Sequence, residues 1–585
     1  MKRSIWLGVP AAFATVIAGF GSTYTATATT EPAAPAGEAG AGGDLLLLQW
    51  QAPSIVNPYL SSGTKDNMAG SVVLEPLANY APETAELVPK LAEDIPTLDN
   101  GGISEDLTSI TWTLQEGLLW SDGSPLTAED AVLTWQYCTD EATGCTSGDN
   151  FDHVADVVAV DDRTIRIDYD QPMPNPYVPF VSAETPILQA AQFADCIGAN
   201  ASTCTEANQF PIGTGPFMVT DFRAEDTVLY EINPNYRGIP DGKPFFGTVE
   251  IKGGGDAAAA ARTVLEEGAA DYGWNLQVAP DVLEQMEAAG NGRVEVGFAA
   301  NVEHLNLNQT NNRNEEAQSE YLDGENPHPL FHDNPDLSRA MSMAIDREEL
   351  VAVGYGDTGR VACNVWMAPP AVSTANDEWC LTQDIEGANA LLDEAGIVDT
   401  NDDGIREVDG VELVLDYYTS TNAVRQDFQA LIEQYWGEIG IDANARNSDA
   451  SIFFGPSTNP DSFLRFYADI QMYTFVPLPD PQTHFSEYTL AAIPEEANGW
   501  GGSNVVRFVN EDFEAAYAEL SQTADPAERD ALTIQLNDIL VQSGAVIPLV
   551  HRGSVSAFAN EMQGVGTLNG WDSEYWNIAD WYREG

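Results

Sequence analysis

The chain has 585 residues, 44% of them hydrophobic, which is enough for several domains with buried cores. Its 91 Asp and Glu residues against 24 Lys and Arg residues give a formal net charge of -67 at pH 7, and this excess predicts an acidic surface. Because such a charge repels polyanions, we expect no nucleic-acid partner and no direct binding to an anionic membrane.

The N-terminus has the pattern of an export signal. Basic residues precede an apolar run over 5–20, and small residues at 26–28 suit a signal peptidase, so 1–28 is predicted to be a signal peptide. No cysteine lies near this cleavage site, so a lipid anchor is not expected. The following segment, 29–43, is rich in Ala, Gly, Pro, Thr and Glu and is predicted to be a disordered linker.

The six cysteines fall in three close pairs, a pattern that fits an oxidising compartment. Many connectivities are possible, and the sequential one, which closes three local loops, is favoured. Its pairs are Cys138 with Cys145, Cys196 with Cys204, and Cys363 with Cys380. A zinc site is not expected, because the sequence has no CxxC and no histidine at ligand spacing from these residues.

The stretch 91–137 carries the most consistent local signals. Apolar residues alternate with threonine over 110–114, which predicts a strand with one buried face. The segment Ser-Asp-Gly-Ser-Pro at 121–125 predicts a turn. Thr127 and Asp130 have the spacing of a capping box, so a helix is expected to begin there.

Other segments complete the pattern along the chain. Glu-Pro-Leu ends the apolar segment 72–77, Pro-Ile-Gly-Thr-Gly-Pro-Phe occupies 211–217, and Ala-Ala-Asp-Tyr-Gly-Trp-Asn occupies 269–275. The glycines of 211–217 lack the GxGxxG and P-loop context, so no nucleotide is expected there. Between 411 and 441 a strand pattern, a helical stripe stopped by glycine and a second strand predict a right-handed β-α-β unit.

An Asp/Asn/Gly-rich segment at 399–404 spaces oxygen atoms as the first half of a calcium loop does. Asp399, Asn401 and Asp403 are its candidate ligands. A complete EF-hand is excluded, because Gly410 stands where that loop needs a bidentate Glu. A weaker structural calcium site and a plain turn before the next strand both remain open.

Together with Arg-Ala and Ala-Ile-Asp-Arg at 339–347, these segments resemble the family 5 extracellular solute-binding proteins, the receptors that deliver peptides, nickel chelates and some oligosaccharides to ABC importers. The resemblance implies an α/β fold with the bilobed periplasmic-binding-protein architecture (type II, cluster C) and an extra domain inserted in the first lobe. The implied boundaries are 44–80, 211–302 and 546–585 for lobe I, 81–210 for the inserted domain II, and 303–545 for lobe III.

The resemblance also implies a ligand site between the lobes. The residues that we expect to bind the ligand are Tyr59, Ser62, Trp274, Asn275, Trp366, Tyr473, Trp500 and Asn504. The aromatic residues among them also have a packing interpretation. Peptide-binding members have an Asp that pairs with the ligand's amine where this chain has Pro477, so a free peptide amine is a less secure ligand here.

We therefore expect the extracytoplasmic substrate-binding component of an ABC importer, which captures a peptide or peptide-like solute between two hinged lobes. It would be a periplasmic or cell-surface monomer that passes its ligand to a permease served by a separate ATPase, and it would meet the membrane only through that permease. An oligosaccharide receptor of the same family is the alternative, and a secreted hydrolase is the alternative from another class. No GxSxG, HExxH or Cys/His dyad supports an enzyme, and no cofactor is expected beyond the possible calcium.

Overall fold

The computed structural model describes residues 37–61, 63–82, 84–313, 326–448, 450–454, 460–475, 479–494 and 502–584, and Ala36–Gly585 forms one compact unit. The predicted signal peptide and the first part of the predicted linker lie outside the described residues. The last part of that linker, 37–43, lies against a neighbouring loop: Gly40 N donates to Pro244 O at 2.8 Å and Gly42 N to Phe245 O at 2.7 Å. No helix in the described ranges is long and apolar enough to cross a membrane.

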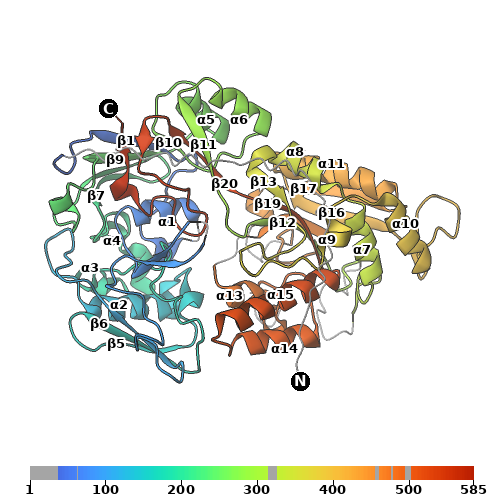
Figure 1. Cartoon of the computed structure of the whole chain (residues 1–585), viewed down its shortest axis with the longest axis horizontal. Coiled ribbons are helices and arrows are strands. Elements are labelled where there is room, and N and C mark those ends of the chain that lie inside the picture. The colour runs from blue at the N-terminus through green and yellow to red at the C-terminus, as the bar shows by residue number, and fades with distance from the viewer. Residues whose placement is uncertain are drawn as a thin grey trace, which may run out of the picture. The chain divides into compact units, whose positions relative to one another are not determined.

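The first large sheet has seven strands in the order β11-β20-β10-β1-β9-β8-β7. β1 pairs in parallel with β9 and β10, and the remaining pairs are antiparallel. Figure 1 shows the late strand β20 inserted between the much earlier β10 and β11. The bounds are β1 Asp44–Leu48, β7 Phe217–Arg223, β8 Thr227–Ile232, β9 Thr248–Lys252, β10 Tyr272–Gly273, β11 Gly292–Gly297 and β20 Ser554–Ala559.

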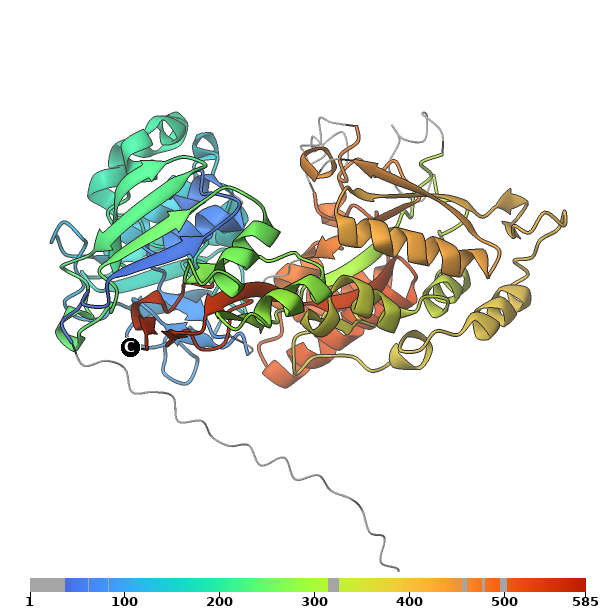
Figure 2. The same ribbon diagram turned by 90° about the horizontal axis from the view of Figure 1, so that it is seen from above.

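The second large sheet has six strands in the order β13-β19-β12-β18-β16-β17. Its strands are β12 Val302–Leu307, β13 Gly359–Val361, β16 Val414–Ser420, β17 Asp442–Ser448, β18 Ile470–Phe475 and β19 Val546–Arg552. β16, the helix α11 and β17 form the predicted β-α-β unit, with β16 and β17 parallel. The helix runs along these two strands in Figure 2 and buries Phe428 and Ile432.

One strand of that unit differs from the prediction. The alternating segment that begins at Val411 forms two short strands, β15 Val411–Glu412 and β16, in place of one. Leu413 between them donates its N–H to Arg406 O at 2.8 Å, so β15 pairs with β14 instead of extending the six-stranded sheet.

The remaining strands form smaller sheets. β4, β6 and β5 form a three-stranded sheet, and β2 with β3, β14 with β15, and β21 with β22 form two-stranded ones. Their bounds are β2 Ala78–Tyr80, β3 Leu87–Pro89, β4 Ser109–Thr113, β5 Val154–Ala159, β6 Thr164–Tyr169, β14 Glu407–Val408, β21 Met562–Gln563 and β22 Tyr582–Arg583. The mixture of parallel pairs, crossover helix and antiparallel sheets confirms the predicted α/β class.

Helix α2 begins where its predicted capping residues stand, and other helices also have side-chain caps. Thr127 N donates to Asp130 Oδ2 at 2.8 Å, so the capping box of α2 forms, and Asp525 accepts from two amides at the start of α15. The bounds are α1 Thr64–Ser71, α2 Ala128–Thr139, α3 Ala190–Phe193, α4 Thr205–Gln209, α5 Ala257–Leu265, α6 Pro280–Glu287, α7 Pro335–Met343, α8 Arg347–Gly354, α9 Asp377–Cys380, α10 Ile385–Glu394, α11 Ala423–Gly437, α12 Ala450–Phe453, α13 Pro481–Ser486, α14 Glu511–Leu520 and α15 Pro526–Gln542.

The three sequential disulfides form as predicted, and no free cysteine lies in the described part of the chain. The stretch 91–137 supplies Trp112, Trp120 and Tyr137, all buried, to a hydrophobic cluster built from residues between Tyr59 and Ala207. The boundaries of an inserted domain in this part of the chain stay a prediction.

Candidate functional site

The chain passes between the two large sheets twice. It leaves the seven-stranded sheet after β11 and enters the six-stranded sheet at β12 through residues 298–301. It returns from β19 to β20 through Gly553 alone. A Cβ added at Gly553 would lie 2.2 Å from Val296 Cγ1, so only glycine lets this crossing approach β11 so closely.

A cavity of about 630 Å³ opens beside these crossings. Its wall comes from the residues after β1, the residues after β10, both crossings and a loop before the C-terminus. Its lining residues include Trp50, Trp274, Asn275, Asn301, Arg552 and Glu574. A volume of this size suits a small solute or a short peptide.

Two tryptophans and a strained asparagine form the wall at the end of β1 and β10. Trp50 Nε1 donates to Asn275 O at 3.1 Å, and Asn275 N donates to Ser556 Oγ at 3.3 Å. Asn275 has φ 52°, in the left-handed region that asparagine tolerates better than most residues. Trp274 is 6% exposed and packs in the core of the seven-stranded sheet, so it is both core residue and cavity wall.

Glu574 is the buried carboxylate of this cavity. Its Oε2 accepts hydrogen bonds from Tyr272 OH at 2.5 Å and from Ser556 Oγ at 2.7 Å. Burial raises the pKa of Glu574 to about 7, although these two hydroxyl donors act to lower it. The group is therefore held in place by neutral donors.

Arg552 brings a positive charge to the same cavity from the end of β19. Its Nε donates to Thr474 Oγ1 at 2.9 Å, and Thr474 in turn contacts Glu303. Glu303 also accepts from Arg425 Nε at 2.6 Å. Burial acts to raise the pKa of Glu303, but the charge and hydrogen bonds of Arg425, together with contributions from Thr474 and Arg552, lower this pKa overall.

Asp572 also lines the cavity, but its carboxylate accepts hydrogen bonds from other parts of the protein. Its carboxylate accepts from Asn79 Nδ2 at 2.8 Å, Tyr80 N at 3.1 Å and Ala183 N at 2.9 Å. Burial raises the pKa of Asp572 while these hydrogen bonds act to lower it. This side chain therefore joins the C-terminal loop to β2.

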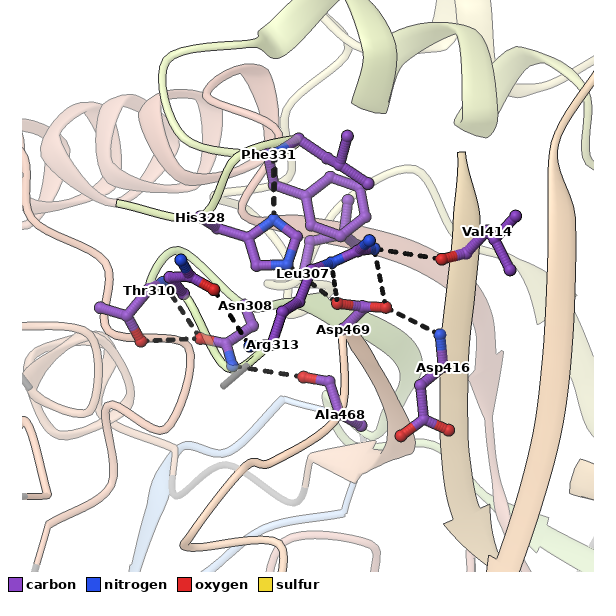
Figure 3. A network of polar contacts seen from close by, with 12 residues as sticks. Leu307, Asn308, Thr310, Arg313, His328, Phe331, Val414, Asp416, Ala468 and Asp469 are labelled. Atoms are coloured by element: carbon purple, nitrogen blue, oxygen red, sulfur yellow. Dashed lines mark hydrogen bonds and ion pairs between the residues drawn. The ribbon is translucent and has the colours of Figure 1, made fainter. Parts of the chain in front are cut away.

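Another buried carboxylate, Asp469, lies at the six-stranded sheet, directly before β18. Asp469 accepts from Arg313 Nε at 3.1 Å and Nη2 at 3.0 Å, from Asp416 N at 2.8 Å and from His328 Nε2 at 2.9 Å (Figure 3). Its burial acts to raise its pKa, but the hydrogen bond from His328 and the charge of Arg313 lower it.

Comparison with known proteins decides the family. The model of bacterial extracellular solute-binding proteins, family 5 (middle region), matches residues 86–491. The chain belongs to this family. The oligopeptide-binding protein AppA of Bacillus subtilis is 26% identical over 424 residues, 70% of each chain. The dipeptide-binding protein of Escherichia coli K12 is 22% identical over 536 residues, which cover 88% of this chain and 90% of that protein.

Solved structures of family 5 proteins show the same fold. AppA from Bacillus subtilis in complex with a nonapeptide has a TM-score of 0.70 at 19% identity and covers 94% of this chain and 100% of its own. NikZ from Campylobacter jejuni in complex with Ni(L-His) has a TM-score of 0.71 at 20% identity. The match covers 92% of this chain and 99% of NikZ. These likenesses confirm the predicted periplasmic-binding-protein fold.

Only part of the predicted ligand set of this family 5 protein lines the large cavity. Trp274 and Asn275 do so. Tyr59 and Asn504 are 0% exposed: Tyr59 OH donates to Pro186 O at 2.7 Å, and Asn504 Nδ2 donates to Tyr488 O, Thr489 O and Phe508 O. Ser62 and Trp500 lie outside the described residues.

Trp366 and Tyr473 pack together in one hydrophobic cluster around α13, α14 and α15. They are 3% and 8% exposed, and their rings lie 5.2 Å from His484 and 5.0 Å from His304. Neither lines the large cavity. A ligand role for these two residues, as for Tyr59 and Asn504, stays a prediction.

A separate cavity of about 340 Å³ lies between residues around 150–179 and α13. Glu487 is among its lining residues, and burial raises the pKa of Glu487 to about 8. Asp480 caps α13 and pairs with Arg529 Nη2 at 2.8 Å, so this carboxylate serves the start of the helix. Pro477 lies outside the described residues.

The predicted calcium ligands form a network of turns. Asp399 accepts from Asp402 N at 2.7 Å and Gly404 N at 2.8 Å, Asn401 accepts from Asp403 N, and Asp403 accepts from Ile405 N. No group of three or more His, Cys, Asp or Glu residues in the described ranges is placed to hold a metal. Calcium binding by this loop stays a prediction.

Sequence reasoning missed Asn301, Arg552 and Glu574. The two crossings carry no periodic pattern, and the C-terminal loop reads as aromatic packing. The available signal was the acidic pair of the string Trp-Asp-Ser-Glu-Tyr at 571–575, directly after the strands that return to the first sheet.

Proposed function

We propose that this protein is the extracytoplasmic substrate-binding component of an ABC importer and that it captures a peptide or peptide-like solute. Membership of family 5 supports the receptor class. The relatives named above as oligopeptide- and dipeptide-binding proteins, and the nonapeptide held by AppA, support the ligand class.

The observation that carries the proposal is the position of the large cavity. It lies where the chain crosses between the two sheets, at 298–301 and Gly553. Short crossings of this kind can act as hinges, because few residues must change backbone angles when the bodies on either side move. A ligand that touches both sides would select the closed arrangement.

The proposal includes an export route and partners. The predicted signal peptide 1–28 would lead the chain across the membrane, where a permease and its ATPase would receive the ligand. Trp50, Trp274 and Arg552 would contact the bound solute, since aromatic and guanidinium groups supply most of the binding energy in such sites. The receptor is proposed to act as a monomer and without a cofactor.

Mass spectrometry of the natively purified protein after denaturation tests the ligand class. We expect a mixture of short, intact peptides. Release of a glycan would contradict the peptide ligand and favour an oligosaccharide receptor. Recovery of cleaved products from an added peptide mixture would contradict the receptor function and favour a hydrolase.

A pair of variants tests the cavity. Trp274→Ala is expected to weaken binding of the released peptides by about tenfold or more, because it removes an aromatic wall. Trp379→Ala is the matched control, since Trp379 lines a different cavity of about 400 Å³ beside α7 and α15. Equal affinities of the two variants would place the ligand elsewhere.

A further inference from the structure

The large cavity contains a buried carboxyl group that forms no ion pair with any of the described residues. Glu574 is 7% exposed and is oriented by Tyr272 and Ser556, both neutral. Two cationic side chains line the same cavity, and neither forms an ion pair with Glu574: Lys65 pairs with Asp66 at 3.1 Å, and Arg552 donates to Thr474. A buried carboxylate of this kind gains most from a bound cation.

A second acceptor in the same wall points to a ligand with N–H groups. Asn301 is 5% exposed, and its Oδ1 has no hydrogen-bond partner among the described residues. The residue is fixed by its backbone, since Arg552 N donates to Asn301 O at 2.9 Å. An unpaired buried amide oxygen costs free energy that a ligand donor would recover.

Another part of the wall suits a partly apolar body. Trp50 and Trp274 contribute indole surface, and the Trp50 N–H is already used by Asn275 O. A compact group with several N–H donors and a positive charge, attached to a larger organic body, therefore fits the cavity chemistry better than a neutral sugar does.

We propose that the solute carries a protonated amine that donates to Glu574, while Asn301 accepts a further N–H group of the same solute. This inference rests on the proposed peptide-receptor function, and it assigns the ammonium to the N-terminus of a short peptide. Glu574 then supplies, from the C-terminal loop beside the seven-stranded sheet, a carboxylate for the amine in a chain that has Pro477 at the family's motif position.

The experiment is a competition for the purified full-length receptor. A lysine-free mixture of three- to six-residue peptides is prepared with free N-termini and, isotopically labelled, with acetylated N-termini. Wild-type protein is expected to enrich the free form by about tenfold or more, the range for a hydrogen bond to a charged group. Glu574→Gln should bring the ratio close to one, and Asn301→Ala should weaken capture of both forms.

Glutamine keeps the shape of Glu574 and an oxygen for Tyr272 and Ser556, so the variant should fold, which its melting temperature checks. Glu487→Gln is the control, because it removes a buried carboxylate from the other cavity and should keep the wild-type ratio. A third arm with acetylated, lysine-containing peptides separates the N-terminal amine from a side-chain amine; preferential capture of that arm would overturn the N-terminal assignment.

The outcomes separate the two claims. If the wild-type protein captures peptides but does not discriminate against acetylation, or if Glu574→Gln discriminates as strongly as wild type, the amine site is overturned and the receptor function stands. If the wild-type protein captures no peptide from the mixture, the proposed function fails and the amine site falls with it. If Glu574→Gln does not fold, the ratio of free to acetylated peptides captured by the wild-type protein decides whether the amine site exists.

Discussion

Two buried carboxylates, one at each large sheet, have opposite surroundings. Asp469 in the six-stranded sheet receives two bonds from Arg313, one from His328 and one from a backbone N–H. Glu574 beside the seven-stranded sheet receives two bonds from neutral hydroxyl groups. The pKa of Asp469 is lowered, whereas burial raises the pKa of Glu574 to about 7.

The difference separates a carboxylate that holds parts of the protein together from one that can bind a ligand. Asp469 joins β16 and β18 to the segments around Arg313 and His328, and it lines none of the described cavities named above (Figure 3). Glu574 lines the large cavity and forms no ion pair with the residues that the structure describes. Burial alone therefore does not distinguish these two carboxylates; the counter-charge at Asp469 and the cavity at Glu574 do.

The largest effect is expected from removing the paired charge. Asp469→Asn removes the negative charge that faces Arg313 and replaces one accepting oxygen by an NH2 group, so it should lower the free energy of unfolding by about 3 kcal/mol. Urea denaturation at pH 7.5 measures it. Asp393→Asn is the control, since Asp393 pairs with Arg406 at 2.7 Å but its side chain is 65% exposed, and it should cost less than about 1 kcal/mol. Similar losses in both variants would remove the distinction.

The unpaired carboxylate should behave in the opposite way. The pKa of Glu574 is about 7 in the folded protein against 4.5 for the unperturbed group, so the folded state holds a proton that the unfolded state has released between these values. The contribution of Glu574 to the free energy of unfolding is therefore fully present below about pH 4.5 and is lost as the pH rises to about 7. Glu574→Gln should be up to about 3 kcal/mol more stable than wild type at pH 8 and equal to it near pH 4.5.

Urea denaturation at pH 4.5, 6 and 8 measures this difference in the absence of added peptide. Parallel stability curves for wild type and Glu574→Gln would show that a cation already neutralises the carboxylate.

The sequence predicted the elements whose signals are local. The turn and capping box in the stretch 91–137 place β4 and α2 correctly, because the residues that decide them lie within a few positions of one another. The three disulfides follow the same rule, since each closes a short loop. The β-α-β unit at β16, α11 and β17 follows from periodicity.

The cavity could not be predicted in the same way, because its wall joins distant segments. Asn301 and Arg552 meet through one backbone hydrogen bond across 251 positions of sequence, at crossings that have no periodic pattern. Asn504 looked like a ligand amide, but its side chain is used by three backbone carbonyl groups. Whether a polar side chain is available depends on such partners, which appear only in the folded chain.

A smaller effect is expected at the histidine that pairs with Asp469. His328 Nδ1 accepts from Leu330 N and Phe331 N, so its Nε2 carries the proton that Asp469 accepts. Burial lowers the pKa of His328 although Asp469 acts to raise it. As the pH falls, His328 therefore binds a proton in the unfolded state before it does so in the folded state. The free energy of unfolding then decreases below about pH 6.5, by about 1.4 kcal/mol per pH unit, until His328 is also protonated in the folded state.

Proton–nitrogen spectra of histidine-labelled protein measure this directly. The neutral tautomer with the proton on Nε2 should persist below pH 6.5, and His328→Gln assigns the signal. A doubly protonated ring at pH 6.5 would mean that Asp469 stabilises the imidazolium, and the network in Figure 3 would then be an ion triad.

The smallest effect should come from one hydroxyl group that orients Glu574. Tyr272→Phe removes a donor to its Oε2, which should raise the pKa of Glu574 further above about 7, because the ionised form loses a hydrogen bond worth about 1 kcal/mol. Carbon-13 spectra of glutamate-labelled protein report the titration, with Glu574→Gln assigning the signal. Tyr230→Phe is the control, since Tyr230 is equally buried but donates to Ala69 O. An unchanged titration in Tyr272→Phe would mean that Ser556 alone holds the carboxylate, and the amine affinity should then depend on Ser556→Ala instead.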